Sequence, residues 1–239
     1  MKLSIIVPVY NEEKTIEKVI EKLRCLNADR ELVIVDDGST DGTRDVLKRI
    51  AAGASGTVGT SGDASTSGAA GLRVVFHEKN RGKGEAVRIG AANSTGDIIC
   101  IQDADLEYDP SEIIKLIDGF KDAGVSAVFG SRFLKDNPNI YKRYLWGNKL
   151  LTGLINLFYG SHYTDTYTCY KLLRREVFDK LDLKSRRYEI EAEISIKLKK
   201  GSFRVIEMPI SYVPRSIEDG KKINWKDAMK GVWTIIKWL

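Results

Sequence analysis

The sequence predicts an α/β fold in which helices cover both faces of a mostly parallel, Rossmann-like sheet. Short continuous apolar runs alternate with amphipathic helical segments along the first half of the chain. Uninterrupted apolar runs are typical of strands that are buried on both faces, as in a parallel sheet. The chain has 239 residues, of which 43% are hydrophobic and 30% charged. This length and composition allow a buried core without disulfide bonds and exclude a disordered or collagen-like chain.

The expected strands and helices follow one another in regular order. The first strand is expected at residues 3–7 and ends at Pro8, and a helix follows over residues 15–26, where apolar residues recur at helical spacing. The other expected strands are residues 32–35, 72–76, 97–102 and 127–129, and the other expected helices are a segment that begins at residues 40–42, residues 84–92 and residues 111–123.

Residues 51–71 interrupt this alternation. Their sequence, AAGASGTVGTSGDASTSGAAG, has no large apolar side chain beyond Val58. Such a segment cannot bury enough surface to offset the entropy cost of ordering it. We therefore expect a flexible surface loop without a function of its own.

Two later segments are apolar and allow two interpretations each. Residues 144–159 are rich in leucine and aromatic residues and are interrupted by Lys149 and Asn156, which predicts either a core helix or a helix in the membrane interface. Residues 225–239 combine tryptophan with interspersed lysine, which predicts a basic amphipathic helix. For this last helix, membrane contact and ordinary packing both remain open.

The charge is unevenly distributed. The whole chain carries a net charge of +5, whereas residues 171–239 alone hold 17 Lys and Arg against 10 Asp and Glu. This asymmetry is either a property of the solvated surface or the sign that the C-terminal third faces phosphates or a membrane surface. A nucleic-acid partner is not expected.

Cysteine usage and hydropathy indicate a cytoplasmic protein. Cys25, Cys100 and Cys169 are far apart, odd in number and form no CxxC motif, so we expect reduced thiols. The N-terminal apolar run is too short for a signal peptide, and no run reaches the ~20 residues that a membrane span needs.

Polar residues follow several of the expected strands, at the edge where parallel α/β sheets bind ligands. These groups are residues 8–12, 36–39, 103–107 and 130–132. Asp103 and Asp105 lie two residues apart just beyond a buried strand, so both carboxylates can approach one cation, and Glu107 could supply a third oxygen. Such hard oxygen ligands suit Mg²⁺ or Mn²⁺ shared with substrate phosphates. The alternative is a solvated turn before Pro110.

Other common catalytic motifs lack support. Gly82-Lys83-Gly84 is not a complete phosphate-binding P-loop, because Glu85 stands where Ser or Thr is required. No GxGxxG follows the first strand, which argues against a Rossmann dehydrogenase. His77 and His162 do not accompany a Ser or Cys motif, so a hydrolase triad is not indicated.

Taken together, these residues resemble family 2 glycosyltransferases of the GT-A fold. The matching segments are SIIVPVYNEE, VIVDDGSTDGT, HEKNRGKGEAVRIGAANSTGDIICIQDADLEYDP and GSRF. Within that family the chain is similar to polyprenyl-phosphate glycosyltransferases of the dolichol-phosphate mannose synthase type, and DTYTCYKLLRREV, YEIEAEI and EMPISYVPRSIEDGKKINWKDAMK extend this similarity. The resemblance implies a GT-A domain at residues 1–215, followed at residues 216–239 by a basic loop and an amphipathic helix.

The resemblance also implies roles for individual residues. The implied nucleotide-sugar-binding residues are Pro8, Tyr10, Glu12, Asp37, Lys83, Asp103 and Ala104, with Asp37 on the base. The implied metal ligands are Asp105, Asp103 and Glu107. The implied ligands of the acceptor phosphate or donor diphosphate are Arg132, Arg143, Lys171, Arg215, Lys221 and Lys222. The implied catalytic residues are Asp105, Arg132 and Asp165.

The sequence departs from the family pattern at two places. Glu107 stands where mannose synthases of this type often have Gln, which leaves the choice of sugar open. Cys169 and Tyr170 replace the usual Gly-Phe, which weakens the assignment of Lys171.

The resemblance implies an inverting, metal-dependent enzyme that moves a hexose from a GDP- or UDP-sugar to a polyprenyl phosphate at the cytoplasmic face of a membrane, where the protein would be peripheral. A cation together with Arg and Lys stabilises the leaving diphosphate. A lipid phosphate is already an anion, whereas a hydroxyl acceptor needs a carboxylate base, for which Asp165 is the candidate; its alternative is a structural role. Two other hypotheses remain open, a soluble or polysaccharide acceptor and a non-catalytic nucleotide-sugar-binding module.

Overall fold

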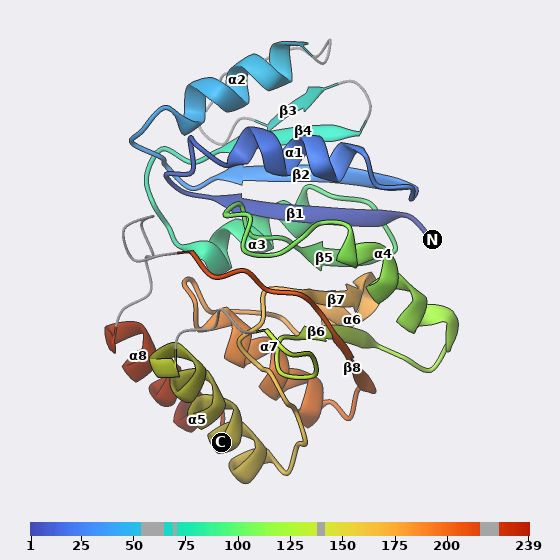
Figure 1. The fold of residues 1–239 in the computed structure, drawn as a ribbon, viewed down its shortest axis with the longest axis vertical. Coiled ribbons are helices and arrows are strands. Elements are labelled where there is room, and N and C mark those ends of the chain that lie inside the picture. The colour runs from blue at the N-terminus through green and yellow to red at the C-terminus, as the bar shows by residue number, and fades with distance from the viewer. Residues whose placement is uncertain (54–64, 69–70, 138–141, 216–224) are drawn as a thin grey trace.

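The computed structural model describes residues 1–53, 65–68, 71–137, 142–215 and 225–239. Within them, eight strands form one sheet in the order β3-β4-β2-β1-β5-β7-β6-β8 (Figure 1). The strands are β1 (Leu3–Val9), β2 (Arg30–Asp36), β3 (Ser65–Gly68), β4 (Leu72–Phe76), β5 (Ile98–Ile101), β6 (Ala127–Ser131), β7 (Lys171–Arg174) and β8 (Val205–Pro209). The helices are α1 (Ile16–Arg24), α2 (Thr43–Gly53), α3 (Lys83–Ala92), α4 (Glu112–Ile117), the 3₁₀ turn η1 (Asp118–Lys121), α5 (Lys142–Tyr159), α6 (Arg175–Lys180), α7 (Ile190–Lys200) and α8 (Trp225–Lys237).

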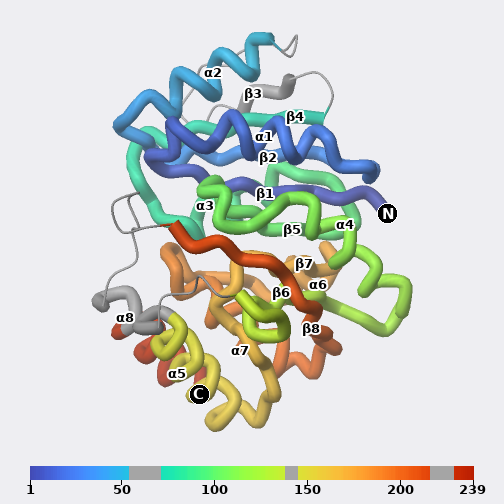
Figure 2. Tube along the Cα trace, viewed as in Figure 1, coloured from blue at the N-terminus to red at the C-terminus, as the bar shows by residue number. Residues whose placement is uncertain are grey.

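The predicted mostly parallel α/β sheet is confirmed. Strand β1 pairs in parallel with β2 and β5, β2 pairs in parallel with β4, and β6 does so with β8. Strand β7 is antiparallel to both of its neighbours, and β3 is antiparallel to β4. The first half of the chain forms one end of the sheet and the second half forms the other (Figure 2).

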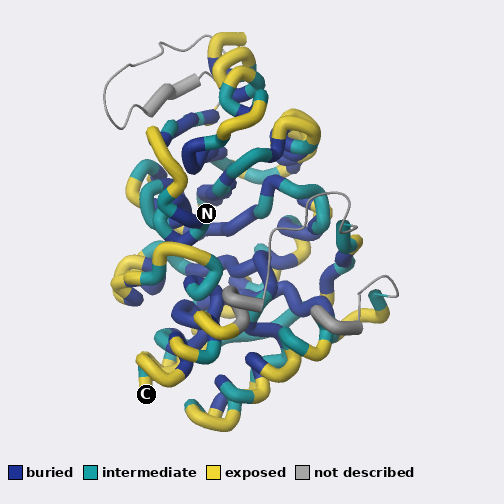
Figure 3. The backbone as a smooth tube through the Cα atoms, turned by 90° about the vertical axis from the view of Figure 1, so that its left-hand side faces the viewer, coloured by how far each residue is buried: buried dark blue, intermediate teal, exposed yellow. Residues whose placement is uncertain are grey.

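The core follows from the apolar strands. All residues of β5 are buried, as are those of β1 except the half-buried Pro8, and buried residues concentrate in the sheet (Figure 3). Helix α1 buries Ile16, Val19, Ile20 and Leu23 against it, as their spacing predicts. Helix α3 approaches β1 closely at Gly90, where a Cβ atom would clash with Ile6 Cγ2.

The prediction that the first strand ends at Pro8 is wrong, because β1 continues through Pro8 to Val9. Pro8 is opposite Val35 of β2, whereas the pairing of β1 with β5 stops at Ile6. Successive residues of a strand point their backbone groups to opposite sides, and the Ile6 carbonyl accepts from Gln102 on the β5 side. The missing amide hydrogen of Pro8 therefore falls beyond the end of β5 and costs no ladder hydrogen bond.

The prediction of one continuous loop over residues 51–71 is wrong for residues 51–53 and 65–68. Helix α2 extends to Gly53, and residues 65–68 pair with β4 as an edge strand. Strand β3 pairs with β4 through its backbone, and a composition without large apolar residues did not reveal that pairing. Residues 54–64 and 69–70 lie outside the described residues.

The second half contains elements for which no boundaries were predicted. Strand β7 leads directly into α6, and α7 precedes β8. Only four residues of β7 pair in the sheet, and it runs against its neighbours. A short antiparallel strand inserted between parallel ones leaves no periodic signal in the sequence.

Helices α5, α7 and α8 pack together through a second apolar cluster. Its buried members are Leu151, Ile155, Ala192, Ile196 and Ile235. Figure 1 shows α5 and α8 side by side at the end of the molecule opposite α2. The predicted C-terminal amphipathic helix is thus confirmed and packs on the body of the protein. No helix within the described ranges combines the length and the hydropathy needed to cross a bilayer.

Candidate active site

Segments that follow β1, β4, β5 and β8 bring five charged side chains to one edge of the sheet. Glu12 follows β1, Asp103 and Asp105 follow β5, and Lys83 opens α3. Arg215 reaches the same edge along the segment after β8, which crosses the sheet in Figure 1. The sequence predicted that the loops after β1 and β5 converge, and the structure places the five side chains in two neighbouring sets of ion pairs, Lys83 with Asp103 and Arg215 with Glu12 and Asp105.

The turn after β5 presents both aspartates. The side chain of Asp103 is 24% exposed and that of Asp105 is 17% exposed. Between them, the carbonyl of Ala104 accepts a hydrogen bond from Thr15 Oγ1 at 2.7 Å, which fixes the turn to α1. Leu106 has φ +61°, in the left-handed region that bulky residues seldom adopt. Strain of this kind persists where the surroundings enforce it and is concentrated at functional sites.

Asp105 is in an unfavourable electrostatic environment. Burial and the neighbouring charges of Asp103 and Glu107 raise its pKa to about 7, against the opposing effect of Arg215. One carboxylate oxygen accepts the Glu107 amide at 3.0 Å, and the other lies 3.4 Å from Arg215 Nη2. A divalent cation would relieve this repulsion between carboxylates.

Lys83 contacts the other aspartate. Its Nζ atom lies 2.8 Å from Asp103 Oδ1 and 2.8 Å from Glu191 Oε1. Burial alone would lower the pKa of Lys83, but the nearby negative charges, Asp103 foremost, raise it well above its usual value. The ammonium group therefore stays charged beside the aspartate turn, at the positive end of helix α3.

Arg215 ties the segment after β8 to the opposite side of the site. Its guanidinium forms a bidentate pair with Glu12, at 2.8 and 2.9 Å. Its backbone amide donates to Glu107 Oε1 at 2.7 Å, and Tyr212 donates its hydroxyl to Glu107 Oε2 at 2.7 Å. Residues 210–215 thus form a strap that is anchored on both Glu12 and Glu107.

The acidic residues fit a metal held jointly with a substrate better than a closed protein cage. Among the described residues, no group of three or more His, Cys, Asp or Glu side chains is placed to hold a metal ion. Both oxygens of Glu107, predicted as a third ligand, accept hydrogen bonds from the strap. Asp103 and Asp105 remain as the hard oxygen donors, and Mg²⁺ is often bound by one or two carboxylates plus substrate phosphates.

Asp37 supports the start of α3. Its carboxylate accepts hydrogen bonds from the backbone amides of Arg81 and Gly82, at 2.8 and 2.7 Å, and contacts His77 Nδ1 at 2.8 Å. Gly82 has φ +100°, a conformation that favours glycine, and precedes Lys83 directly. The predicted contact of Asp37 with a nucleotide base stays a prediction. Pro8 and Tyr10, also predicted for the donor, are half-buried at the end of β1.

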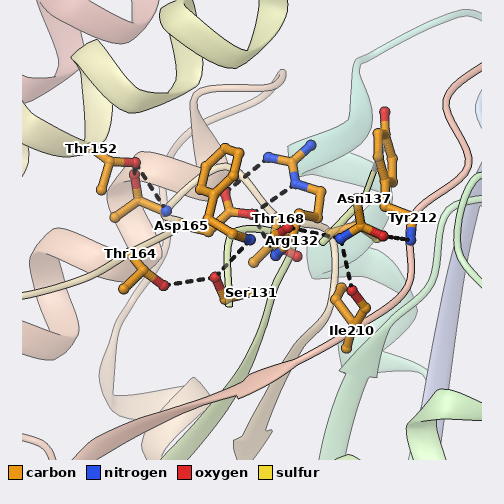
Figure 4. A network of polar contacts seen from close by, with 12 residues as sticks. Ser131, Arg132, Asn137, Thr152, Thr164, Asp165, Thr168, Ile210 and Tyr212 are labelled. Atoms are coloured by element: carbon orange, nitrogen blue, oxygen red, sulfur yellow. Dashed lines mark hydrogen bonds and ion pairs between the residues drawn. The ribbon is translucent and has the colours of Figure 1, made fainter. Parts of the chain in front are cut away.

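Arg132 and Asp165 form a buried pair (Figure 4). Asp165 is fully buried, and both of its oxygens accept from the Arg132 guanidinium, at 2.7 and 2.9 Å. Asn137 links the carbonyl of Arg132 to the strap, where it bonds Ile210 and Tyr212. This geometry favours a structural role for the pair, and the predicted roles as phosphate ligand and base stay predictions.

The other predicted acceptor ligands are not assembled by the described structure. Lys171 is fully buried and donates to the carbonyls of Thr166 and Thr168 and to Glu191. Lys221, Lys222 and the side chain of Arg143 lie outside the described residues. Sequence reasoning missed Glu191, which bridges Lys171 and Lys83, although the alternating acids in YEIEAEI could have indicated charged partners nearby.

Residues 4–182 match glycosyl transferase family 2. The chain belongs to this family. It is 28% identical to the dolichol-phosphate mannosyltransferase of Pyrococcus furiosus, over 100% of this chain and 64% of the relative. It is 26% identical to an undecaprenyl-phosphate 4-deoxy-4-formamido-L-arabinose transferase of Enterobacter sp., over 92% of this chain and 62% of the relative. The chain thus spans less than two thirds of the length of either relative.

A solved structure shows the same fold. The glucosyl-3-phosphoglycerate synthase of Mycobacterium tuberculosis, in complex with Mn²⁺, UDP-glucose and phosphoglyceric acid, aligns with a TM-score of 0.72 and 20% identity, over 99% of this chain and 79% of that one. The predicted family and the GT-A fold are therefore confirmed.

Proposed function

We propose that this family 2 glycosyltransferase moves a hexose from a GDP- or UDP-sugar to a polyprenyl phosphate. The observation that carries the proposal is the strained aspartate turn, with Lys83 and Arg215 beside Asp103 and Asp105. Relatives named for dolichol phosphate and undecaprenyl phosphate support the acceptor class. The structural relative with Mn²⁺ and UDP-glucose supports a nucleotide-sugar donor with a divalent cation.

In this mechanism Asp103 and Asp105 would hold Mg²⁺ or Mn²⁺. The cation supplies charge neutralisation for the departing diphosphate. An oxygen of the acceptor phosphate attacks the anomeric carbon from the side opposite the leaving group, the bond to the diphosphate breaks, and the nucleoside diphosphate leaves. Lys83 faces the diphosphate. A phosphate acceptor carries its own negative charge, so no carboxylate base is required, which agrees with the pairing of Asp165 to Arg132.

The outer faces of α5 and α8 support peripheral membrane contact. Trp146, Leu150 and Leu157 share the face of α5 opposite its packed side, and all three are more than 60% exposed. Met229, Trp233 and Ile236 form an equivalent exposed stripe on α8, near Lys230 and Lys237. Apolar and aromatic residues flanked by lysine are typical of helices that lie in a membrane interface.

A transfer assay tests the function. Labelled GDP- and UDP-hexoses are incubated with the protein, Mn²⁺ and polyprenyl phosphate, and organic-phase label is counted. We expect lipid-linked label that disappears with EDTA. Absence of lipid-linked label with every donor would refute a polyprenyl-phosphate acceptor. Transfer of label to a soluble acceptor instead would favour the alternative hypothesis of a soluble or polysaccharide acceptor.

Vesicle binding tests the membrane contact separately. We expect Trp146→Ser with Trp233→Ser to reduce co-sedimentation with anionic vesicles several-fold, since burial of tryptophan and leucine at an interface provides the binding energy. The control is Leu134→Ser, which changes an exposed apolar residue on neither helix. An equal loss of vesicle co-sedimentation in the Leu134→Ser control would contradict membrane contact through α5 and α8.

A further inference from the structure

A chain of four side chains with alternating charge runs from the aspartate turn into the interior. Asp103 contacts Lys83, Lys83 contacts Glu191, and Glu191 contacts Lys171. The side chain of Asp103 is 24% exposed, that of Lys83 is 12% exposed, and that of Lys171 is fully buried. The chain therefore connects the site to a fixed point inside the protein.

The ammonium group of Lys171 is held in place in the interior by three hydrogen-bond partners. Its Nζ atom donates to the carbonyl of Thr168 at 2.6 Å and that of Thr166 at 3.0 Å, and its third partner is Glu191 Oε2 at 2.5 Å. An ammonium group has three donors, so all of its hydrogen-bonding capacity is used. Glu191 Oε2 is thereby held in place, and Oε1 is left to face Lys83.

Glu191 lies on a rigid element. Helix α7 buries Ile190, Ala192, Ile194 and Ile196, so the backbone that carries Glu191 is packed on the core and against α5. Lys83 is fixed at its backbone as well, because Asp37 holds the amide of Gly82 and the Glu85 amide donates to the Arg186 carbonyl. The flexible stem of Lys83 is therefore restrained at both ends.

The two carboxylates and the two ammonium groups of this set balance in charge. Lys171 compensates Glu191, so Glu191 can hold the Lys83 ammonium without cancelling the positive charge that it presents beside Asp103. A lysine side chain carries ~2 kcal/mol of rotamer entropy, and a group ordered in advance does not have to be ordered when an anion binds.

We propose that Glu191 is a positioning residue that holds the Lys83 ammonium group toward the diphosphate of the donor. This inference rests on the proposed function, since it assumes a nucleotide-sugar donor at this edge of the sheet. Glu191 does not contact the donor itself. Its effect passes through Lys83 and concerns the diphosphate rather than the nucleoside.

Calorimetric binding of UDP, GDP, UMP and GMP tests the proposal. We expect Glu191→Gln to weaken binding of the diphosphate that the wild type prefers by about tenfold, the equivalent of 1.4 kcal/mol. Binding of the matching monophosphate should change much less, so the preference for diphosphate falls. A role in stability alone would lower the melting temperature without changing this preference.

A double-mutant cycle identifies Lys83 as the intermediary. Lys83→Met should weaken diphosphate binding at least as much as Glu191→Gln, and the double variant should be no worse than Lys83→Met, because coupled residues are non-additive. Glu31→Gln is the matched control, since it removes a half-buried, ion-paired Glu at the opposite end of the sheet. It should leave the diphosphate preference unchanged.

A second variant keeps the test valid if Glu191→Gln does not fold. Combining Lys171→Met with Glu191→Gln removes both buried charges, which avoids an uncompensated ammonium group in the interior. The same loss of diphosphate preference is expected. Unchanged diphosphate binding, or additive losses with Lys83→Met, would overturn the proposal. Failure of the wild type to bind any of the four nucleotides would overturn the proposed function as well.

Discussion

The amino ends and the carboxyl ends of the parallel strands each carry a cluster of polar side chains around a carboxylate. The two clusters differ in how many favourable partners the carboxylate has. At the amino end, Glu31 of β2 accepts hydrogen bonds from Ser4, Lys2 and the amides of Thr95 and Gly96. Burial alone would raise its pKa, but these donors lower the pKa of Glu31 to about 2. At the carboxyl end, burial and its acidic neighbours raise the pKa of Asp105 to about 7.

This difference separates stability from function. A carboxylate with several donors strengthens the fold and needs nothing further. A carboxylate that is buried near other carboxylates destabilises the folded protein and gains stability when a cation binds, so its presence indicates a site. Both clusters hold together elements that are distant in sequence, and only the carboxyl-end cluster leaves negative charge for a ligand to neutralise.

The largest expected effect is on transfer by Asp105→Asn. If Asp105 helps to hold the cation that neutralises the departing diphosphate, its loss should reduce turnover by about 10³-fold, the scale seen when one transition-state-stabilising group is removed. The fold should persist, since the change removes a repelled charge. The radiolabel assay measures the rate, and circular dichroism measures the fold. Equal activity losses in Asp105→Asn and in the amino-end variant Glu31→Gln would contradict the assignment of function to the carboxyl-end cluster.

Asp165→Asn tests a well-paired carboxylate on the site side of the molecule. It leaves the Arg132 guanidinium buried without its counter-charge, which typically costs about 3–5 kcal/mol. Urea denaturation should show this loss of unfolding free energy, and replacement of both residues by Arg132→Met with Asp165→Asn should recover much of it. Unchanged stability with lost transfer would instead support Asp165 as the base that the sequence suggested.

The sequence revealed those parts of the fold and site that rest on local patterns. The apolar runs located β1, β2, β4, β5 and β6, and the acidic pair after β5 was recognisable because strand ends of a parallel sheet converge. Helix α1 was readable from its buried stripe. These features depend on the periodicity of one segment and on a general rule of topology.

Long-range pairing was not readable from the sequence. The family resemblance implied that Arg132 and Lys171 are phosphate ligands. Their counter-charges lie 33 and 20 residues away, on other elements, and the structure buries both pairs. The short β7 and the link between Glu191 and Lys83 escaped detection for the same reason, because each depends on tertiary neighbours.

Glu31→Gln is expected to have a smaller effect than the change at Asp165. The neutral amide keeps the shape of the side chain but loses charge-assisted hydrogen bonds, and its NH₂ group faces donors. A loss of about 1–3 kcal/mol of unfolding free energy follows, without loss of transfer. Ser4→Ala, which removes one donor to the same carboxylate, should cost less than Glu31→Gln. The reverse order would show that Ser4 stabilises the fold through Gly96, to which its hydroxyl also bonds, rather than through Glu31.

The two carboxylates should also differ in the pH dependence of the unfolding free energy, measured by urea denaturation of protein in EDTA. Asp105 has an ordinary pKa of 3.8 when unfolded and about 7 when folded, so between these values the folded protein binds more protons. Its contribution to the unfolding free energy therefore falls as pH rises from about 4 to 7.

Glu31 should act in the opposite direction. Its pKa is lowered from 4.5 to about 2, so its contribution is present above pH 4.5 and is lost as pH falls toward 2. Asp105→Asn should flatten only the limb between pH 4 and 7, and Glu31→Gln only the limb below 4.5. If each variant keeps both limbs, the pKa values of the two carboxylates do not differ as their surroundings indicate. The inference that the carboxylates of the aspartate turn have fewer favourable partners than Glu31 would then be wrong.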